Sequence, residues 1–257
     1  MQLQFYKYQG TGNDFVMIDN RRGEFPKNNT KFVSRLCDRK FGIGADGLIL
    51  LEDSETANFS MIYYNADGNP GSMCGNGARC ITHFARFLGI IEAKAKFEAV
   101  DGVHHATIEG DVISLKMQDV NNIEVYNHYC YLNTGSPHHV AMVTGLQEYD
   151  VFNEGRSLRN SLYGTEGANI NFVEAISEDT VNVRTYERGV EDETLSCGTG
   201  VTAVALALAE TGMTTGNEVS LQTPGGVLKV SYKKTTEGYE DIFLIGPATM
   251  VFKGEWE

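Results

Sequence analysis

The sequence lacks an excess of positive charge. It has 21 Lys and Arg residues against 34 Asp and Glu residues, and the formal net charge is −13. This balance argues against nucleic-acid binding, which requires basic stripes, and against docking on anionic membranes, which requires polybasic clusters. No apolar run reaches the roughly 18 residues of a spanning helix, and the first residues do not read as a signal peptide. We therefore expect a cytoplasmic protein with no membrane and no nucleic acid among its partners.

Patterns for disulfides, metals and cofactors are also missing. The five cysteines are an odd number, and no C-x-x-C pair or Cys/His run has zinc spacing, so neither a disulfide framework nor a metal site is expected. No Gly-x-Gly-x-x-Gly follows a strand at a Rossmann position, and there is no P-loop. The lysines stand in no context typical of a pyridoxal Schiff base. We expect no cofactor.

The sequence does contain an internal repeat. Cys74-Gly75-Asn76-Gly77 and Cys197-Gly198-Thr199-Gly200 share the pattern C-G-x-G and lie 123 residues apart. The same offset relates further pairs: Thr11-Gly12 with Thr134-Gly135, Gly44-Ala45 with Gly167-Ala168, Tyr63 with Tyr186, Gly89 with Gly212, and Gly102 with Gly225. Several matches in one register predict two copies of one unit, related by a pseudo-twofold, with no gap from residue 11 to 102.

Hydrophobic periodicity gives a similar set of elements in each copy. In the first copy we predict strands at Leu3–Tyr8, Phe15–Asn20, Leu48–Leu51 and Phe59–Tyr64, an amphipathic helix at Lys31–Lys40 and a helix at Ala78–Leu88. In the second copy we predict strands at Tyr129–Asn133, His139–Val143, Ile170–Ala175 and Thr180–Tyr186, and a helix at Val201–Glu210. That last helix is apolar on all sides and is therefore expected to be buried.

These elements predict an α+β protein of two pseudo-symmetric units, each a mostly antiparallel or mixed sheet wrapped around a central helix. Late strands within Ala106–Gln118 and Val219–Ile245 would close the sheets. We place residues 1–119 and 247–257 in an N-terminal unit that carries Cys74, and residues 120–246 in a C-terminal unit that carries Cys197. The active site is expected in the cleft between them.

The repeated C-G-x-G pattern has a chemical meaning. Each cysteine is expected to precede a helix across a turn of glycines, which puts its sulfur beside the positive end of the helix dipole. Such a position lowers a thiol pKa from about 8.5 toward neutrality. The N–H groups of the same helix end can bind a carboxylate.

Two such devices facing each other suit the inversion of a carbon stereocentre. One thiolate would remove a proton from one face while the other thiol delivers a proton to the opposite face. Cys37, Cys80 and Cys130 do not share the pattern, and we expect them to be buried and inert.

The motifs together resemble those of the diaminopimelate epimerase family, in order and over nearly the whole chain. The residues that carry the resemblance are Thr11-Gly12-Asn13-Asp14-Phe15, Gly44-Ala45-Asp46-Gly47, Asn65-Ala66-Asp67-Gly68, Cys74-Gly75-Asn76-Gly77-Ala78-Arg79, Pro137-His138, Tyr186-Glu187-Arg188-Gly189, Cys197-Gly198-Thr199-Gly200 and Gly246-Pro247-Ala248-Thr249. Single motifs are shared with proline racemase and its relatives, but the full set is more specific.

The resemblance implies a homodimeric isomerase that interconverts LL- and meso-2,6-diaminopimelate without pyridoxal phosphate, on the route to lysine and peptidoglycan. It implies that Cys74 and Cys197 are the catalytic acid and base, and that His138 and Glu187 tune them. The substrate-binding residues implied are Asn13, Asn65, Gly75, Asn76, Asn169, Glu187, Arg188, Gly198 and Thr199, with Arg188 on the distal carboxylate.

The chain departs from the family pattern near the distal site. Ser136 stands where many members have Asn, and Asn69-Pro70-Gly71 replaces the usual stretch before the first cysteine. Without the resemblance, His138 would read as a packed histidine and Asn65 as part of a turn. Arg79 is expected to be solvated or structural.

Three alternatives remain open. A proline or hydroxyproline racemase could use the same scaffold, but Arg188 and the asparagines would then lack a distal group to bind. An isomerase of the phenazine-biosynthesis type would not be expected to keep both cysteines. A thiol redox sensor or a small-ligand binding module would show no exchange of the substrate's α-hydrogen with solvent.

Overall fold

A computed structural model describes residues 2–257, and within this range the chain forms four α-helices, one short 3-10 helix and 17 strands. The helices are α1 (Thr30–Cys37), α2 (Gly75–Phe87), α3 (Val151–Tyr163) and α4 (Gly198–Glu210), with the 3-10 helix at Leu146–Glu148. The fold divides into two compact units. Unit 1 comprises the chain up to Leu115 together with Gly246–Glu257, and unit 2 comprises Lys116–Ile245. No helix in the described range is long and apolar enough to cross a membrane.

The sheet of unit 1 has the last strand of the chain beside the first. Its strands, in spatial order, are β17 (Thr249–Trp256), β1 (Leu3–Gly10), β2 (Asn13–Asp19), β3 (Gly47–Glu52), β4 (Phe59–Asn65), β5 (Lys94–Ala99), β6 (Gly102–Glu109) and β7 (Val112–Lys116). Pairs β2–β3 and β4–β5 are parallel, and the other adjacent pairs are antiparallel. The predicted return of the C-terminal segment therefore occurs through pairing of β17 with β1.

The sheet of unit 2 repeats the same series. Its strands are β8 (Ile123–Val125), β9 (Tyr129–Asn133), β10 (Pro137–Met142), β11 (Asn169–Ser177), β12 (Thr180–Glu187), β14 (Glu218–Thr223), β15 (Gly226–Lys234) and β16 (Tyr239–Pro247), and β13 (Asp192–Thr194) adds to β12. Pairs β10–β11 and β12–β14 are parallel, at the positions of the parallel pairs in unit 1. The predicted α+β fold of two mixed sheets is confirmed.

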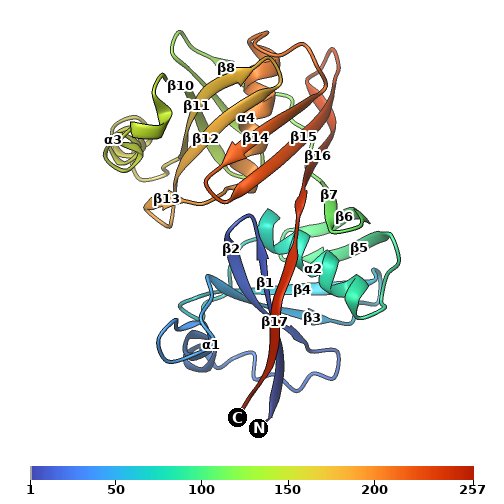
Figure 1. Cartoon of the computed structure of the whole chain (residues 1–257). Helices are drawn as coiled ribbons and strands as arrows, with labels where there is room; N and C mark the ends of the chain where they lie inside the picture. Colours follow the sequence, from blue (N-terminus) through green and yellow to red (C-terminus); the bar gives the residue numbers. More distant parts are fainter. Residues whose placement is uncertain (1) are drawn as a thin grey trace. The chain divides into compact units, whose positions relative to one another are not determined.

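Each sheet curls around one helix, as Figure 1 shows for α2 and α4. Helix α2 contacts β1, β2, β3, β4, β6 and β17, and α4 contacts β9, β10, β11, β14 and β15. Ten of the 13 residues of α4 are buried, which confirms the expectation drawn from its uniformly apolar sequence. The hydrophobic effect on these two helices holds each unit around its own core.

The repeat is visible in the backbone as well as in the sequence. Positive φ angles recur at the offset of 123 in Gly12 and Gly135, in Gly44 and Gly167, and in Gly89 and Gly212. The next such turn pairs Gly102 with Gly226, so the offset is 124 there rather than the predicted Gly225. One extra residue between α4 and β15 accounts for the slip, and the prediction of an ungapped repeat up to residue 102 is wrong at its end.

Helix boundaries and one whole helix differ from the sequence expectations. Helices α2 and α4 begin at Gly75 and Gly198, so the glycines form the first helical turn instead of a turn before it. Helix α1 ends at Cys37 rather than Lys40, and α3 was not predicted at all. Within α3, Gly155 reads as a helix breaker, but a Cβ there would lie 2.4 Å from Tyr186 Cβ. The glycine allows close packing of α3 on β12.

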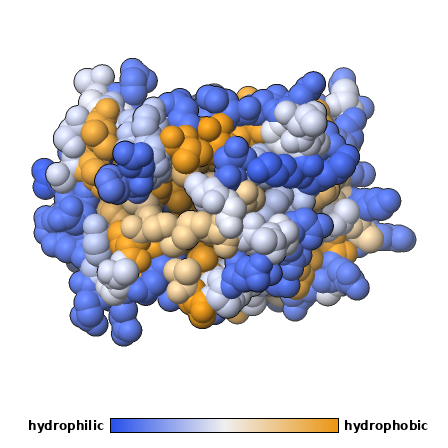
Figure 2. All heavy atoms as spheres, turned by 90° about the horizontal axis from the view of Figure 1, so that it is seen from above, coloured by the Kyte–Doolittle hydropathy of each residue, from blue (hydrophilic) through white to orange (hydrophobic). Residues whose placement is uncertain are grey.

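Hydrophilic side chains cover much of the visible surface (Figure 2). Figure 2 shows one face of the molecule, on which hydrophilic side chains dominate and hydrophobic ones lie between them. Isolated exposed hydrophobic residues are normal for a globular protein and need no binding partner to explain them.

Candidate active site

Both repeated cysteines occupy the same structural position, the residue that caps the start of a central helix. Cys74 precedes α2 with φ −120° and ψ 120°, and Cys197 precedes α4 with φ −121° and ψ 114°. The first turns of both helices contain no acidic side chain. The N–H groups of these turns have no acceptor inside the helix itself, so each sulfur lies beside an anion-binding helix end.

Glycine is needed in the first turn of α4 because the chain packs closely there. A Cβ on Gly200 would lie 2.6 Å from Asn171 Oδ1, 3.2 Å from Cys197 Cβ and 3.3 Å from Cys197 Sγ. The equivalent Gly77 in α2 meets side-chain ends instead, with Ile49 Cδ1 at 2.8 Å and Met61 Cε at 3.2 Å. The C-G-x-G pattern is thus partly a packing requirement around the thiol.

In unit 1 the thiol of Cys74 faces an amide oxygen. Cys74 Sγ lies 3.5 Å from Asn13 Oδ1, and Asn76 Nδ2 donates to the same oxygen at 3.4 Å. The orientation of the Asn13 amide is set by its Nδ2, which donates to a carboxylate oxygen of Asp46 at 2.7 Å. The predicted residues Asn13, Cys74 and Asn76 are therefore brought together.

Charged residues surround Asp46, the hydrogen-bond partner of Asn13. Arg39 bridges Asp14 and Asp46, and Lys7 pairs with Asp14 at 2.6 Å. Burial acts to raise the pKa of Asp14, but hydrogen bonds from Arg39 and Lys7 outweigh it and hold the pKa at about 2. Asp14 is therefore ionised at neutral pH, and the network that holds Asn13 is charged.

Arg79 is structural, one of the two readings the sequence left open, and it is fully buried. Its guanidinium donates to Asn76 Oδ1 at 3.0 Å, to Thr11 Oγ1 at 2.9 Å and to the carbonyl oxygen of Pro247 at 3.3 Å. Burial lowers its pKa, while the neighbouring thiols of Cys80 and Cys74 raise it. A buried cation thus orients Asn76 beside the first thiol.

In unit 2 the thiol of Cys197 faces hydroxyl groups. Cys197 Sγ lies 3.5 Å from Thr199 Oγ1, and Thr199 Oγ1 lies 3.3 Å from Ser136 Oγ. Ser136 Oγ is also 3.0 Å from His138 Nε2 and accepts from Asn169 Nδ2 at 3.0 Å. Ser136 therefore joins four residues that the sequence predicted for the site: His138, Asn169, Thr199 and Cys197.

His138 is buried and neutral. Burial, followed by the charge of Arg188, lowers its pKa to about 3. Its ring nitrogens are engaged by Ser136 and by Asn171 Nδ2, the latter at 3.2 Å from Nδ1. At neutral pH this imidazole is not a charged partner for a thiolate and acts through hydrogen bonds.

The remaining predicted residues lie at the ends of strands. Glu187 ends β12 and accepts from Thr194 Oγ1 at 2.9 Å. Arg188 follows it; its backbone N–H donates to Asn169 Oδ1 at 2.9 Å and its guanidinium to the carbonyl oxygen of Glu166 at 2.9 Å. Asn65 ends β4 in unit 1, is exposed, and its backbone closes the turn to Gly68 and Asn69. The turn reading of Asn65 is correct for its backbone.

The other three cysteines are buried, as expected. Burial raises the pKa of Cys37 and Cys80 to about 12, and raises that of Cys130 as well. Thiols of this kind stay protonated and unreactive at neutral pH. Burial alone does not separate them from the repeated pair, because Cys197 is also buried, whereas Cys74 is partly exposed.

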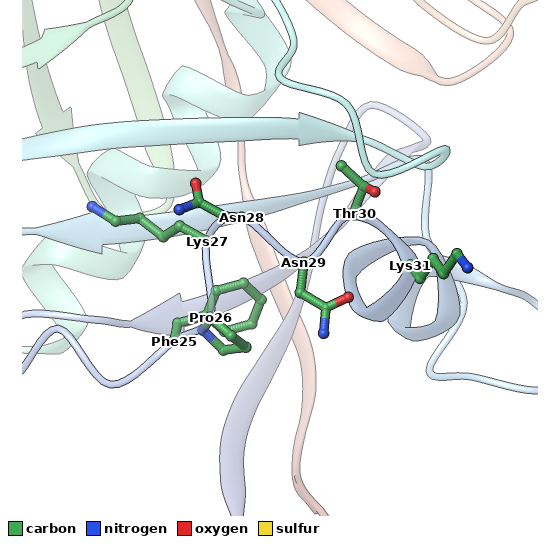
Figure 3. A pocket seen from close by; sticks show the side chains of 7 residues that line it. All are labelled: Phe25, Pro26, Lys27, Asn28, Asn29, Thr30 and Lys31. Carbon is green, nitrogen blue, oxygen red and sulfur yellow. The ribbon is translucent and has the colours of Figure 1, made fainter.

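An open depression of about 690 Å³ lies elsewhere in unit 1, before and at the start of α1. Its lining is the segment from Phe25 to Lys31, whose side chains Figure 3 shows. Lys27 in this segment is paired with Glu52 at 2.9 Å. Neither Cys74 nor Cys197 lines the depression.

Comparison with known proteins identifies the family. The family model for diaminopimelate epimerase matches residues 5–122 and 130–251. The chain belongs to the diaminopimelate epimerase family. It is 55% identical over 253 residues to the diaminopimelate epimerase of Flavobacterium psychrophilum, with 98% of this chain and 99% of that protein covered. It is 43% identical to the enzyme of that name from Chlorobaculum tepidum, covering 95% of this chain and 98% of that protein. The resemblance seen in the sequence motifs is confirmed.

Solved structures share the epimerase fold at low sequence identity. A phenazine biosynthesis protein of the PhzF family from Bacillus anthracis superposes with a TM-score of 0.81 at 16% identity, covering 100% of this chain and 99% of that one. A probable proline racemase from Agrobacterium radiobacter gives a TM-score of 0.70 at 15% identity, covering 99% and 93%. The two-unit architecture is therefore common to several chemistries, and the family assignment comes from sequence.

Several residues of the epimerase site were missed as site members by sequence reasoning. Ser136 was noted only as a departure, and Asp46, Asn171, Thr185 and Thr11 were given no role. The repeat contains a signal that finds three of the contacts, because positions 13, 46 and 76 correspond to 136, 169 and 199 at the offset of 123. Applying the offset to site residues as well as glycines would have placed Ser136 beside Thr199 and Asn169.

Proposed function

We propose that the chain interconverts LL- and meso-2,6-diaminopimelate, with Cys74 and Cys197 as the two groups that exchange the α-proton. Family membership and 55% identity to a diaminopimelate epimerase support the activity. The reaction is an isomerisation, and the family works without pyridoxal phosphate. The observation that carries the residue assignment is that α2 and α4 are each directly preceded by a capping cysteine in the same backbone conformation.

The proton balance is simple in either direction. One sulfur, as thiolate, takes the proton from the α-carbon on one face, and the other sulfur, as thiol, gives its proton to the opposite face. The carbon inverts, and the two sulfurs exchange protonation states. The scheme requires both half-sites to serve one substrate molecule.

The helix ends supply the electrostatic part of the mechanism. Removing the α-proton makes the proximal carboxylate enolate-like, and N–H groups of Gly75, Asn76, Gly198 and Thr199 are suited to hold the added charge. The partial positive charge of each helix end also favours the deprotonated form of the thiol beside it. One structural device thus stabilises both the base and the intermediate.

The distal end of the substrate needs polar partners of its own. Arg188 carries a guanidinium that can bind a carboxylate in a bidentate manner, and it is anchored through its backbone to Asn169. Asn13, Asn65, Asn169 and Glu187 complete the proposed binding set. A cyclic amino acid such as proline has no distal amine or carboxylate for these groups, which favours diaminopimelate over proline.

We further propose that the enzyme acts in the cytoplasm, as a homodimer, in the formation of lysine and peptidoglycan precursors. The family resemblance supports the dimer. The strongly acidic surface composition, with a formal charge of −13, favours small-molecule chemistry over binding to nucleic acid.

Hydrogen exchange at the α-carbon tests the proposal. Separated LL- and meso-diaminopimelate are incubated with the protein in D2O, with proline and hydroxyproline as control substrates. The wild-type protein should incorporate deuterium at the α-carbon and invert it in diaminopimelate alone. Cys74→Ala or Cys197→Ala should each lower epimerisation by at least about 10³-fold, because one proton partner is removed.

Cys130→Ala is the matched control, since Cys130 is a buried thiol of unit 2 outside the repeat. It should retain activity. Near-normal turnover in Cys74→Ala or Cys197→Ala would overturn the two-thiol scheme. Ligand binding without any α-hydrogen exchange would favour a binding module or a redox sensor instead.

A further inference from the structure

The hydrogen bonds around Ser136 have a direction that the amide groups fix. Asn171 Nδ2 donates to the carbonyl oxygen of His139 at 2.9 Å, and its Oδ1 accepts from Thr185 Oγ1 at 3.0 Å. A carbonyl oxygen can only accept, so the amide orientation of Asn171 is determined. The group that faces His138 Nδ1 is therefore an N–H donor.

The tautomer of His138 follows from this contact. Because Nδ1 accepts from Asn171, the single proton of the neutral ring is on Nε2. That proton is donated to Ser136 Oγ, which lies 3.0 Å away. Full burial of His138 keeps the ring in this neutral, directed form.

Ser136 receives a second donor. Asn169 Oδ1 accepts the backbone N–H of Arg188 at 2.9 Å, and its Nδ2 donates to the carbonyl oxygen of Pro137 at 3.2 Å, so its orientation is also fixed. Asn169 Nδ2 then donates to Ser136 Oγ at 3.0 Å. With two donors on its oxygen, Ser136 directs its own proton to Thr199 Oγ1 at 3.3 Å.

We propose that Ser136 and Thr199 form a directed relay that delivers an O–H donor to the sulfur of Cys197. Thr199 accepts from Ser136 and turns its own proton toward Cys197 Sγ, 3.5 Å away. A donor at the sulfur stabilises the thiolate over the thiol. Ser136 is thus a positioning residue, and His138 acts on Cys197 through it. The inference rests on the proposed function only in taking Cys197 as a reactive thiol.

The charged and titratable groups on nearby elements have partners of their own or are neutral. Glu187 and Arg188, at the end of β12, carry opposite charges. On strands packed against α4, Glu174 accepts from Gly145 N–H, Glu218 pairs with Lys229, Lys233 with Glu240 and Lys234 with Glu210. Burial keeps Cys130 on β9 and His139 on β10 in their neutral forms.

The pH dependence of cysteine alkylation tests the relay without using enzymatic turnover. The protein is treated with limiting iodoacetamide from pH 5 to 10, and the modification of Cys197 and Cys74 is measured separately by peptide mass spectrometry. Only the thiolate reacts, so the midpoint for each cysteine reports its acidity. Thr199→Val should raise the Cys197 midpoint by about one pH unit and leave that of Cys74 in place.

Three further variants separate the relay from general effects. Thr199→Ser keeps the hydroxyl and should restore the midpoint, and Ser136→Ala should raise it in the same direction as Thr199→Val. Thr202→Val is the matched control, because its hydroxyl in α4 bonds only the carbonyl oxygen of Gly198, at 2.9 Å. An unchanged Cys197 midpoint in Thr199→Val, or an equal rise in Thr202→Val, would overturn the relay. Absence of deuterium exchange with these shifts present would overturn the proposed function alone.

Discussion

The two half-sites use the same positions but present opposite hydrogen-bonding groups to their sulfurs. Residue 13 in unit 1 corresponds to 136 in unit 2, 46 to 169, and 76 to 199, all at the offset of 123. In unit 1 an amide oxygen of Asn13 faces Cys74, and in unit 2 a hydroxyl of Thr199 faces Cys197. The duplication kept the contacts among these three positions, but the sulfur meets position 13 in unit 1 and the equivalent of position 76 in unit 2.

The difference starts at one pair of positions. Asp46 is a carboxylate and can only accept, so it takes the N–H of Asn13 and leaves the Asn13 oxygen toward the thiol. Asn169 is an amide and donates to Ser136, which passes the direction on to Thr199. Because one copy has a carboxylate here and the other an amide, the group that faces the sulfur is an acceptor in unit 1 and a donor in unit 2.

Charge differs between the half-sites as well. Position 79 is a fully buried arginine, and its equivalent in unit 2 is Thr202, whose hydroxyl bonds its own helix. The field of a buried cation favours a thiolate at Cys74, whereas a donated O–H does so at Cys197. The two thiols that exchange roles in the proposed reaction are thus expected to be tuned by different physical means.

The largest expected contrast is between alanine substitutions at the equivalent glycines. In Gly200→Ala the new methyl group meets the fixed Asn171 amide and Cys197, so we expect kcat to fall by about 10²-fold and stability by about 1–3 kcal/mol. In Gly77→Ala the methyl group meets the movable ends of Ile49 and Met61, and we expect a change within a few-fold. Thermal unfolding and steady-state kinetics measure both. Equal losses in the two variants would contradict the asymmetry.

Much of the fold could be predicted because periodic patterns act locally. The apolar stretch of α4 and the alternating strands on either side of Gly12 specify their own structure. Helix α3 could not be predicted, because Gly155 is a packing contact with Tyr186 that only the tertiary structure creates. The start of α2 was misplaced for a related reason, since Gly77 is a helical glycine at which a Cβ would lie 2.8 Å from Ile49 Cδ1.

The sequence predicts the thiols and the histidine of the candidate site. It does not predict the residues that hydrogen-bond to them. Cys74, Cys197 and His138 stand out through repeat and motif. The roles of Ser136 and Asn171 depend on which way an amide or hydroxyl points, and that is set by partners such as the carbonyl oxygen of His139 and the hydroxyl of Thr185, which no motif specifies. Hydrogen-bond direction is a property of the folded network, not of residue spacing.

A smaller effect is expected from removing the buried charge of unit 1. Arg79→Met keeps most of the side-chain volume and should raise the alkylation midpoint of Cys74 by about one pH unit, with that of Cys197 unchanged. Arg79→Lys, which keeps the charge, is the control and should shift the midpoint less. Circular dichroism verifies that both variants are folded. A shift of equal size in Arg79→Lys and Arg79→Met would assign the effect to lost hydrogen bonds and not to charge.

The smallest effect concerns stability at low pH. We expect acidification to destabilise unit 2 before unit 1. Burial lowers the pKa of His138 to about 3, with Arg188 contributing, and that of His139 to about 4. Both histidines stay neutral in the folded protein while the unfolded chain takes up protons below about pH 6.5. Their contribution to stability is complete above that pH and is lost as the pH falls toward the folded values, by about 1.4 kcal/mol per pH unit for each.

Amide hydrogen exchange in α4 and in α2 measures this loss of stability separately for unit 2 and unit 1. Between pH 6.5 and 5, the opening free energy of α4 should fall more than that of α2. Carboxylates such as Asp14 titrate below this window, because hydrogen bonds from Arg39 and Lys7 overcome burial and hold its pKa at about 2. His139→Phe keeps the stacking on Tyr129 and should remove about half of the slope, whereas Tyr163→Phe, which deletes only the hydrogen bond to His139, should keep it. If His139→Phe leaves the slope of α4 unchanged, the acid sensitivity of unit 2 has another source than its buried imidazoles.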